Sequence, residues 1–179
     1  MKKFMIVLLA LSLGLVEAMA VDIFLKIGEL KGESTDSVHK DDIDVLAWSW
    51  GMSQSGSTHT GGGAGAGKAT FQDLSLTKYV DRTSVKLIES LAKGTHFPLA
   101  VLVIRKPGDK PVEYLKITLK DVIVTSLSTG GYHGEDRLTE SISLNFREFL
   151  VEYIPVNPKT GSAEDGIPFA WDISKNAVP

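Results

Sequence analysis

The sequence predicts a mainly β, mostly antiparallel fold with a single helix. Past residue 20, apolar residues recur mostly at every second position, which is the period of a half-buried strand. Only residues 84–93 carry an apolar repeat at helical spacing. Because the strand-like segments follow one another without alternating helices, a parallel sheet built from strand–helix–strand units is excluded.

About seven strands are predicted, over residues 23–27, 42–54, 70–79, 99–105, 112–126, 138–154 and 167–173. Between them the sequence predicts polar or glycine-rich loops at 28–40, 60–70, 128–137 and 155–166, and a turn at 107–109. The strands at 112–126 and 138–154 far exceed the usual length of about five or six residues. Such strands either bend through two sheets of a barrel or extend past the core, where an exposed strand end can pair with another chain.

The one predicted helix is short and depends on packing against the sheet. Its apolar stripe, which we expect to face the sheet, consists of Val85, Ile88, Leu91 and Ala92. Thr83 or Ser84 is predicted to cap its start. Lys93 suits the last turn and Gly94 the position just past the end.

A short aromatic segment, Trp48-Ser49-Trp50, lies in the second predicted strand. Strand alternation puts both tryptophans on one face and Ser49 on the other. We expect the tryptophans to face the core and Ser49 to be exposed. The functional question is therefore what the face of Ser49 looks onto.

The first twenty residues have the layout of a secretory signal peptide. Lys2 and Lys3 precede an apolar run over residues 4–16, and the small-x-small pattern Ala18-Met19-Ala20 follows. The alternative interpretation is an upstream start, with the true N-terminus at Met19. In both interpretations residues 1–20, as a signal peptide or a spurious extension, are expected to lie outside the fold, and residues 21–179 are predicted to form one domain.

Composition narrows the function classes. Without Lys2, Lys3 and Glu17 the formal net charge of −3 becomes −4, which argues against a nucleic-acid-binding protein. The thirteen-residue apolar run is too short for an ordinary membrane span, so no stable membrane insertion is predicted. The chain has no cysteine, which excludes disulfides and thiolate chemistry.

The stretch T-G-G-G-A-G-A-G-K-A-T at residues 60–70 resembles the glycine-lysine frame of a phosphate-binding loop. The residue after Lys68 must then be Ser or Thr to hold magnesium, but it is Ala69. The flanking segments also read as two strands, whereas a phosphate loop leads into a helix. The stretch is therefore predicted to be a long connecting loop, of the kind that is functional or disordered.

No catalytic, metal or cofactor site is predicted. Four groups of residues have side chains suited to catalysis or metal binding, namely Ser34, Ser37 and His39; Ser57 and His59; Asp41, Asp42 and Asp44; and His133, Glu135 and Asp136. No G-x-S-x-G turn frames a serine, and no metal-ligand spacing is recognised. Glu135, Asp136 and Arg137 are instead candidates for ion pairs, local or between chains.

Several stretches of the sequence are distinctive. They are M-A-V-D-I-F-L-K-I from residue 19, G-E-S from 32, I-D-V-L-A-W-S-W-G-M-S-Q-S-G-S from 43, G-G-G-A-G-A-G-K from 61, Q-D-L-S-L-T-K-Y from 72, Y-L-K-I-T-L-K-D-V from 114, S-T-G-G from 128 and G-E-D-R-L-T-E from 134. These stretches resemble the haemolysin-coregulated protein (Hcp) family, the inner-tube subunits of type VI secretion systems. The resemblance covers essentially all of residues 19–179.

This resemblance implies a two-sheet antiparallel β-barrel with one flanking helix, like phage tail-tube proteins, and no catalytic activity. It implies homohexameric rings that stack into a hollow tube, with contractile sheath, spike protein and effector cargo as partners, and secretion of the subunit itself. Ser49 would then face the bore and contact cargo. The loop residues Gly61, Gly62, Gly63, Gly65, Gly67 and Lys68 would contact a neighbouring subunit or ring.

The first twenty residues depart from the family pattern. Family members usually start near the position of Met19 and carry no signal peptide, because the tube assembles in the cytoplasm. A cleaved signal peptide would direct the subunit to the periplasm first. An exported monomeric β-barrel that binds a small ligand in its interior, as lipocalin-like proteins do, is the alternative from another class. A phosphate-binding enzyme is a third, and Ala69 weighs against it.

Overall fold

The computed structural model describes residues 20–54, 68–108 and 111–179, so residues 1–19 of the predicted signal peptide and residues 61–67 of the glycine loop lie outside the described residues. The elements in chain order are β1 (Asp22–Ile27), β2 (Ile43–Ser49), β3 (Met52–Ser53), β4 (Thr70–Phe71), β5 (Leu74–Tyr79), α1 (Ser84–Lys93), β6 (His96–Lys106), β7 (Val112–Gly130), β8 (Thr139–Tyr153) and β9 (Ile167–Asp172). Within these ranges no helix is long and apolar enough to cross a membrane.

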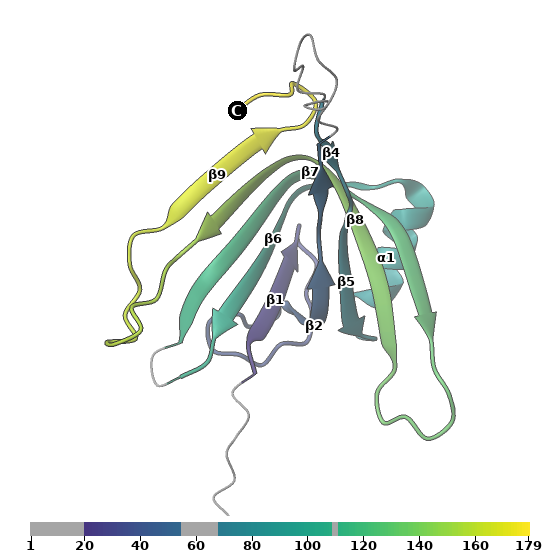
Figure 1. The fold of residues 1–179 in the computed structure, drawn as a ribbon. Helices are drawn as coiled ribbons and strands as arrows, with labels where there is room; N and C mark the ends of the chain where they lie inside the picture. Colours follow the sequence, from purple (N-terminus) through teal and green to yellow (C-terminus); the bar gives the residue numbers. More distant parts are fainter. Residues whose placement is uncertain (1–19, 55–67, 109–110) are drawn as a thin grey trace, which may run out of the picture.

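Seven strands form one antiparallel sheet in the order β5-β2-β1-β6-β7-β8-β9. A further pairing between β5 and β8 closes the first six strands into a barrel and leaves β9 as an added edge strand. Figure 1 shows that β7 and β8 bend over the top of the fold, so that each serves both sides of the barrel. The first part of β8 pairs with β5 and its last part with β9. The predicted mainly β barrel with one helix is therefore confirmed.

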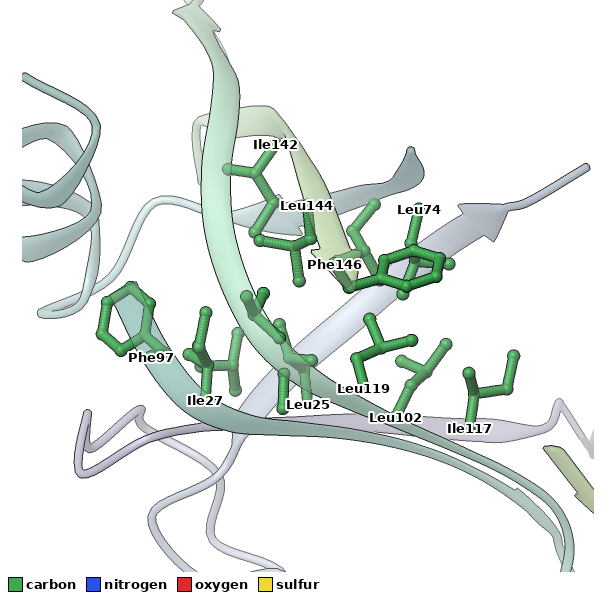
Figure 2. Close-up of a cluster of buried hydrophobic side chains, with 14 of the residues drawn as sticks. Leu25, Ile27, Leu74, Phe97, Leu102, Ile117, Leu119, Ile142, Leu144 and Phe146 are labelled. Atoms are coloured by element: carbon green, nitrogen blue, oxygen red, sulfur yellow. The ribbon is translucent and has the colours of Figure 1, made fainter. Parts of the chain in front are cut away.

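The barrel interior is filled by apolar side chains from every closing strand. Nineteen buried hydrophobic residues form one cluster, and Figure 2 shows Leu25, Leu102 and Leu119 converging at its centre. Burying a side chain of this size contributes about 1.5–3 kcal/mol to stability. The barrel interior is thus occupied by packed apolar side chains, which weighs against the interior ligand that the lipocalin-like alternative needs.

The second predicted strand, residues 42–54, is interrupted. A β-bulge between Val45 and Ala47 shifts the pairing of β2 with β5, and Trp50 and Gly51 separate β2 from β3. Because a bulge inserts one residue, it exchanges the two faces of the strand. Val45 therefore points inward before the bulge and Trp48 packs against the core after it.

The helix has the predicted boundaries but the opposite orientation. Its buried residues are Ser84, Leu87 and Ser90. The apolar stripe, which the sequence predicts to face the sheet, is instead exposed; it consists of Val85, Ile88, Leu91 and Ala92. Buried polar partners cause the inversion, because the Ser84 hydroxyl donates to Glu140 Oε1 at 2.8 Å.

The caps of α1 agree only in part with prediction. Thr83 occupies the N-cap position but its side chain makes no cap hydrogen bond to the helix. Instead, the Thr83 amide donates to Asp81 Oδ1 at 2.8 Å, and the Asp81 amide donates to Ser84 Oγ at 3.0 Å. Gly94 ends the helix in the left-handed conformation (φ 62°, ψ 39°), as predicted.

Candidate functional site

Four neighbouring strands carry a patch of small side chains, all but one of them hydroxylated. We call it the serine face and define it by Ala47, Ser49, Ser75, Thr77, Ser126, Ser128, Ser141 and Ser143. Together with Trp48, Leu76 and Ile142, these residues line a shallow depression of about 240 Å³. Ser49 is exposed, as its alternation with the half-buried Trp48 and Trp50 predicts. Trp50 is held beneath by its indole N–H, which donates to the Gln72 carbonyl oxygen at 3.0 Å.

Strand register aligns the serines in a row across the sheet. Ser49 pairs with Ser75, Ser75 with Ser143, and Ser143 with Ser126. The hydroxyls of Ser75 and Ser143 are 3.4 Å apart. The next row, two residues along each strand, consists of Ala47, Thr77, Ser141 and Ser128.

The serine face is polar and uncharged. Each hydroxyl can both donate and accept a hydrogen bond, so the face can contact polypeptide of varied sequence without selecting a charge. The small side chains also project little from the sheet, which lets a large molecule approach its backbone. The chemistry is that of a permissive contact surface.

The serine face is bounded by two strand edges without a described partner. Past Asp44, β2 pairs only with β5, and past Ile123, β7 pairs only with β8, among the residues that the structure describes. Because the order β2-β5-β8-β7 is antiparallel at each step, these two edges run in opposite directions. Each edge leaves backbone N–H and C=O groups available to another chain.

The glycine loop emerges from a paired base. β3 pairs with β4 through Met52 with Phe71 and Ser53 with Thr70. Lys68, the first described residue after the loop, is exposed. Gly61, Gly62, Gly63, Gly65 and Gly67 themselves lie outside the described residues, so their contacts stay a prediction.

The three candidate ion-pair residues lie in the exposed connection between β7 and β8. Arg137 stacks its guanidinium 3.9 Å above the Tyr79 ring. Glu135 Oε2 accepts a long hydrogen bond, 3.4 Å, from the Tyr132 amide. No ion pair of Glu135, Asp136 or Arg137 forms with another described residue, so these charges are available to a partner.

A fully buried lysine, Lys78, lies beside the start of β8. Lys78 Nζ donates to Glu140 Oε1 at 2.8 Å, to Asp81 Oδ1 at 2.9 Å and to the Tyr79 carbonyl oxygen at 2.7 Å. These bonds tie β5 to the start of β8 and to the segment that leads into α1. Sequence reasoning missed this cluster because alternation predicts only which face Lys78 occupies, and an interior lysine is rare.

The loop at 28–42 is held by a second polar cluster. His39 stacks on Phe24 with 4.3 Å between ring centroids. Its Nδ1 lies 2.9 Å from Asp42 Oδ2 and its Nε2 lies 3.2 Å from Glu113 Oε1. The structure thus brings His39 to carboxylates and not to the hydroxyls of Ser34 or Ser37.

The same loop is fastened to the barrel by Arg105. The guanidinium of Arg105 bonds both carboxylate oxygens of Asp36, at 3.0 and 2.6 Å, and also bonds Asp22 at 2.8 Å. These side-chain hydrogen bonds hold the pKa of Asp36 well below its usual range and raise the pKa of Arg105. The cluster therefore serves to fix the loop.

Comparisons with known proteins agree with this geometry. Residues 24–153 match the family model described as "Type VI secretion system effector, Hcp". Protein hcp1 of Pseudomonas aeruginosa is 58% identical over 161 residues, which cover 88% of this chain and 98% of that protein.

Solved structures of Hcp proteins share the fold. A type six secretion system protein superposes with a TM-score of 0.83 at 32% identity, covering 88% of this chain and 99% of the other. Hcp1 from Salmonella typhimurium superposes with a TM-score of 0.73 at 38% identity, covering 88% and 98%. The family match, the close relative and the closed barrel agree, and the chain belongs to the Hcp family of type VI secretion proteins.

Proposed function

We propose that this chain is a structural subunit of a type VI secretion inner tube. It assembles as hexameric rings that stack into a hollow tube, carries effector proteins in the bore, and is itself secreted. The observation that carries the proposal is the serine face between two open strand edges, found in a chain of the Hcp family.

The two edges support a closed ring. If β7 of one copy lies beside β2 of the next, the antiparallel order β2-β5-β8-β7 continues from copy to copy. A contact between two different edges is heterologous, and a heterologous contact closes into a ring when its rotation permits. The serine faces then form one continuous surface around the centre, and Ser49 faces the bore.

Light scattering and negative-stain microscopy of the purified protein test assembly. Rings of six with an open centre are expected. A clean monomer at high protein concentration would contradict the proposal. The filled interior makes a small-ligand barrel a poor alternative even then.

Substitution of Ser49 tests the bore. Ser49→Gln adds a long side chain to the centre of the serine face and is expected to leave ring formation unchanged while reducing retention of a co-expressed effector. Ser37→Gln, at an exposed serine in the 28–42 loop, is the matched control. Unchanged retention by the Ser49 variant in intact rings would remove Ser49 from the cargo surface.

The contractile sheath, the spike protein and the effector cargo are the partners expected of such a tube. The exposed charges of Glu135, Asp136 and Arg137, and Lys68 at the base of the glycine loop, are the candidate contacts between subunits or stacked rings.

A further inference from the structure

The outward face of α1 is apolar although the helix lies at the surface. Val85, Ile88 and Leu91 are 70%, 48% and 37% exposed, while the inward face contributes Ser84 and Ser90 beside Leu87. A surface helix of a globular protein normally shows the reverse arrangement. The anomaly is a contiguous stripe over two turns, not a scattered exposed residue.

A second apolar surface lies on β9. Ile167 and Phe169, on one face of this strand, are 63% and 54% exposed. Phe169 also lines a groove of about 520 Å³ together with Met52, Phe71 and Trp171. β9 pairs with β8 on one side, and on its other side no described strand pairs with it.

The two surfaces lie on opposite sides of the molecule. Figure 1 shows β9 at the upper left and α1 at the right, and within the chain α1 packs on β7. Neither surface can therefore cover the other inside one subunit. A head-to-tail ring needs two different patches that face opposite neighbours.

Charges flanking the two surfaces are opposite in sign. Lys86 and Lys93, both exposed, flank the stripe on α1, and both pair with Glu89, so these three charges sum to one net positive charge. Glu164 and Asp165, also exposed, immediately precede β9. Two copies of the α1 stripe facing each other would instead bring two surfaces of net positive charge together, which disfavours a symmetric helix pair.

We propose that the α1 stripe of one subunit packs against the β9 surface of the next copy, as the outer half of the subunit interface. This inference rests on the proposed ring and assigns it a second contact, outside the paired strand edges. Lys86 and Lys93 then lie near Glu164 and Asp165 of the neighbour, and the apolar stripe is buried on assembly.

Paired cysteines test the contact directly, because the chain has no cysteine of its own. Ile88→Cys combined with Phe169→Cys is expected, after mild oxidation, to give a ladder of covalent species up to the hexamer on a non-reducing gel. Each single variant is expected to stay monomeric on that gel. Ile88→Cys combined with Lys40→Cys, at an exposed residue of the 28–42 loop, is the matched control.

The cross-linking results distinguish failure of the proposed α1–β9 contact from failure of the proposed ring. Rings seen by light scattering without cross-links in the Ile88–Phe169 pair would overturn the contact and leave the tube proposal standing. Covalent dimers from Ile88→Cys alone would overturn it in favour of a symmetric helix pair. A wild-type protein that stays monomeric would contradict both the ring and the α1–β9 contact.

Charge reversal provides an independent test that leaves the core intact. Lys86→Glu with Lys93→Glu is expected to weaken ring assembly by about tenfold, and adding Glu164→Lys with Asp165→Lys is expected to restore it. Reversal without any loss of assembly, in a protein with an unchanged unfolding midpoint, would contradict the contact.

Discussion

Lys78 stabilises the contact between β5, the start of β8 and the segment that leads into α1. Its ammonium group is fully buried and bonds both Asp81 and Glu140. Lys78→Met would leave two buried carboxylates without their cation, so we expect a loss of about 3–5 kcal/mol in the free energy of unfolding. Urea unfolding measures it.

The control at this scale is a lysine in an exposed pair. Lys86 is 3.1 Å from Glu89 on the helix surface, and Lys86→Met is expected to cost at most about 1 kcal/mol. Adding Glu140→Gln to Lys78→Met should recover part of the lost stability, because it removes one uncompensated charge. Equal losses for the two lysine variants would contradict this account.

Asp36 makes the free energy of unfolding depend on pH. Its carboxylate has a lowered pKa because Arg105 and the amide of His39 donate to it. At low pH the unfolded chain therefore binds a proton at Asp36 more readily than the folded chain does. The contribution of the ionised Asp36 carboxylate to the free energy of unfolding is complete above about pH 4 and is lost as the pH falls further. Wild-type protein and Asp36→Asn should thus differ more in unfolding free energy at pH 6 than at pH 2. A difference independent of pH would assign the role of Asp36 to packing.

Residue chemistry also explains what could be predicted of the site. Alternation around Trp48 and Trp50 is a local property, so the exposure of Ser49 follows from sequence. The row that joins Ser49 to Ser75, Ser143 and Ser126 depends on strand register across the closed barrel. Periodicity does not specify which strands are neighbours, so the serine face could not be assembled from sequence.

At the scale of elements, the ends of α1 could be predicted from the sequence, but the face that it turns toward the barrel could not. Its ends follow from Gly94 and from the residues around Thr83, which are local signals. Its orientation does not, because Ser84 is held inward by hydrogen bonds to Lys78 and Glu140, and Glu140 lies on a strand far along the chain. β2 is a second case, since the bulge after Val45 interrupts an otherwise regular alternation.

The C-terminus of α1 offers a test of backbone conformation alone. Gly94 has a positive φ, and a Cβ at this position would meet nothing within 4 Å. Gly94→Ala should therefore cost about 1 kcal/mol of unfolding free energy, from left-handed backbone strain without any clash. Gly130→Ala is the control, because a Cβ there is equally free and the residue has no positive φ. Thermal or urea unfolding distinguishes the two, and equal effects would contradict the strain argument.

For the whole molecule, the strand lengths connect fold to assembly. β7 and β8 are long because each passes from one side of the barrel to the other, as their two sets of partners show. The bend closes the core within one chain, yet among the described residues the two outer edges of the four-stranded serine face have no strand partner. These edges and the exposed α1 stripe are the features on which the proposed association with further copies of the chain rests.

The glycine loop provides the last test at this scale. The base of the loop is the β3–β4 pair, and the barrel core lies elsewhere. Deleting residues 61–67 should therefore leave the unfolding midpoint unchanged while weakening ring or tube assembly, since glycines allow a backbone to lie close against a partner. Circular dichroism measures the first effect and light scattering the second. Loss of folding in the deletion variant would mean that the loop supports its own subunit, and rings and tubes of unchanged stability would mean that it contacts no neighbour.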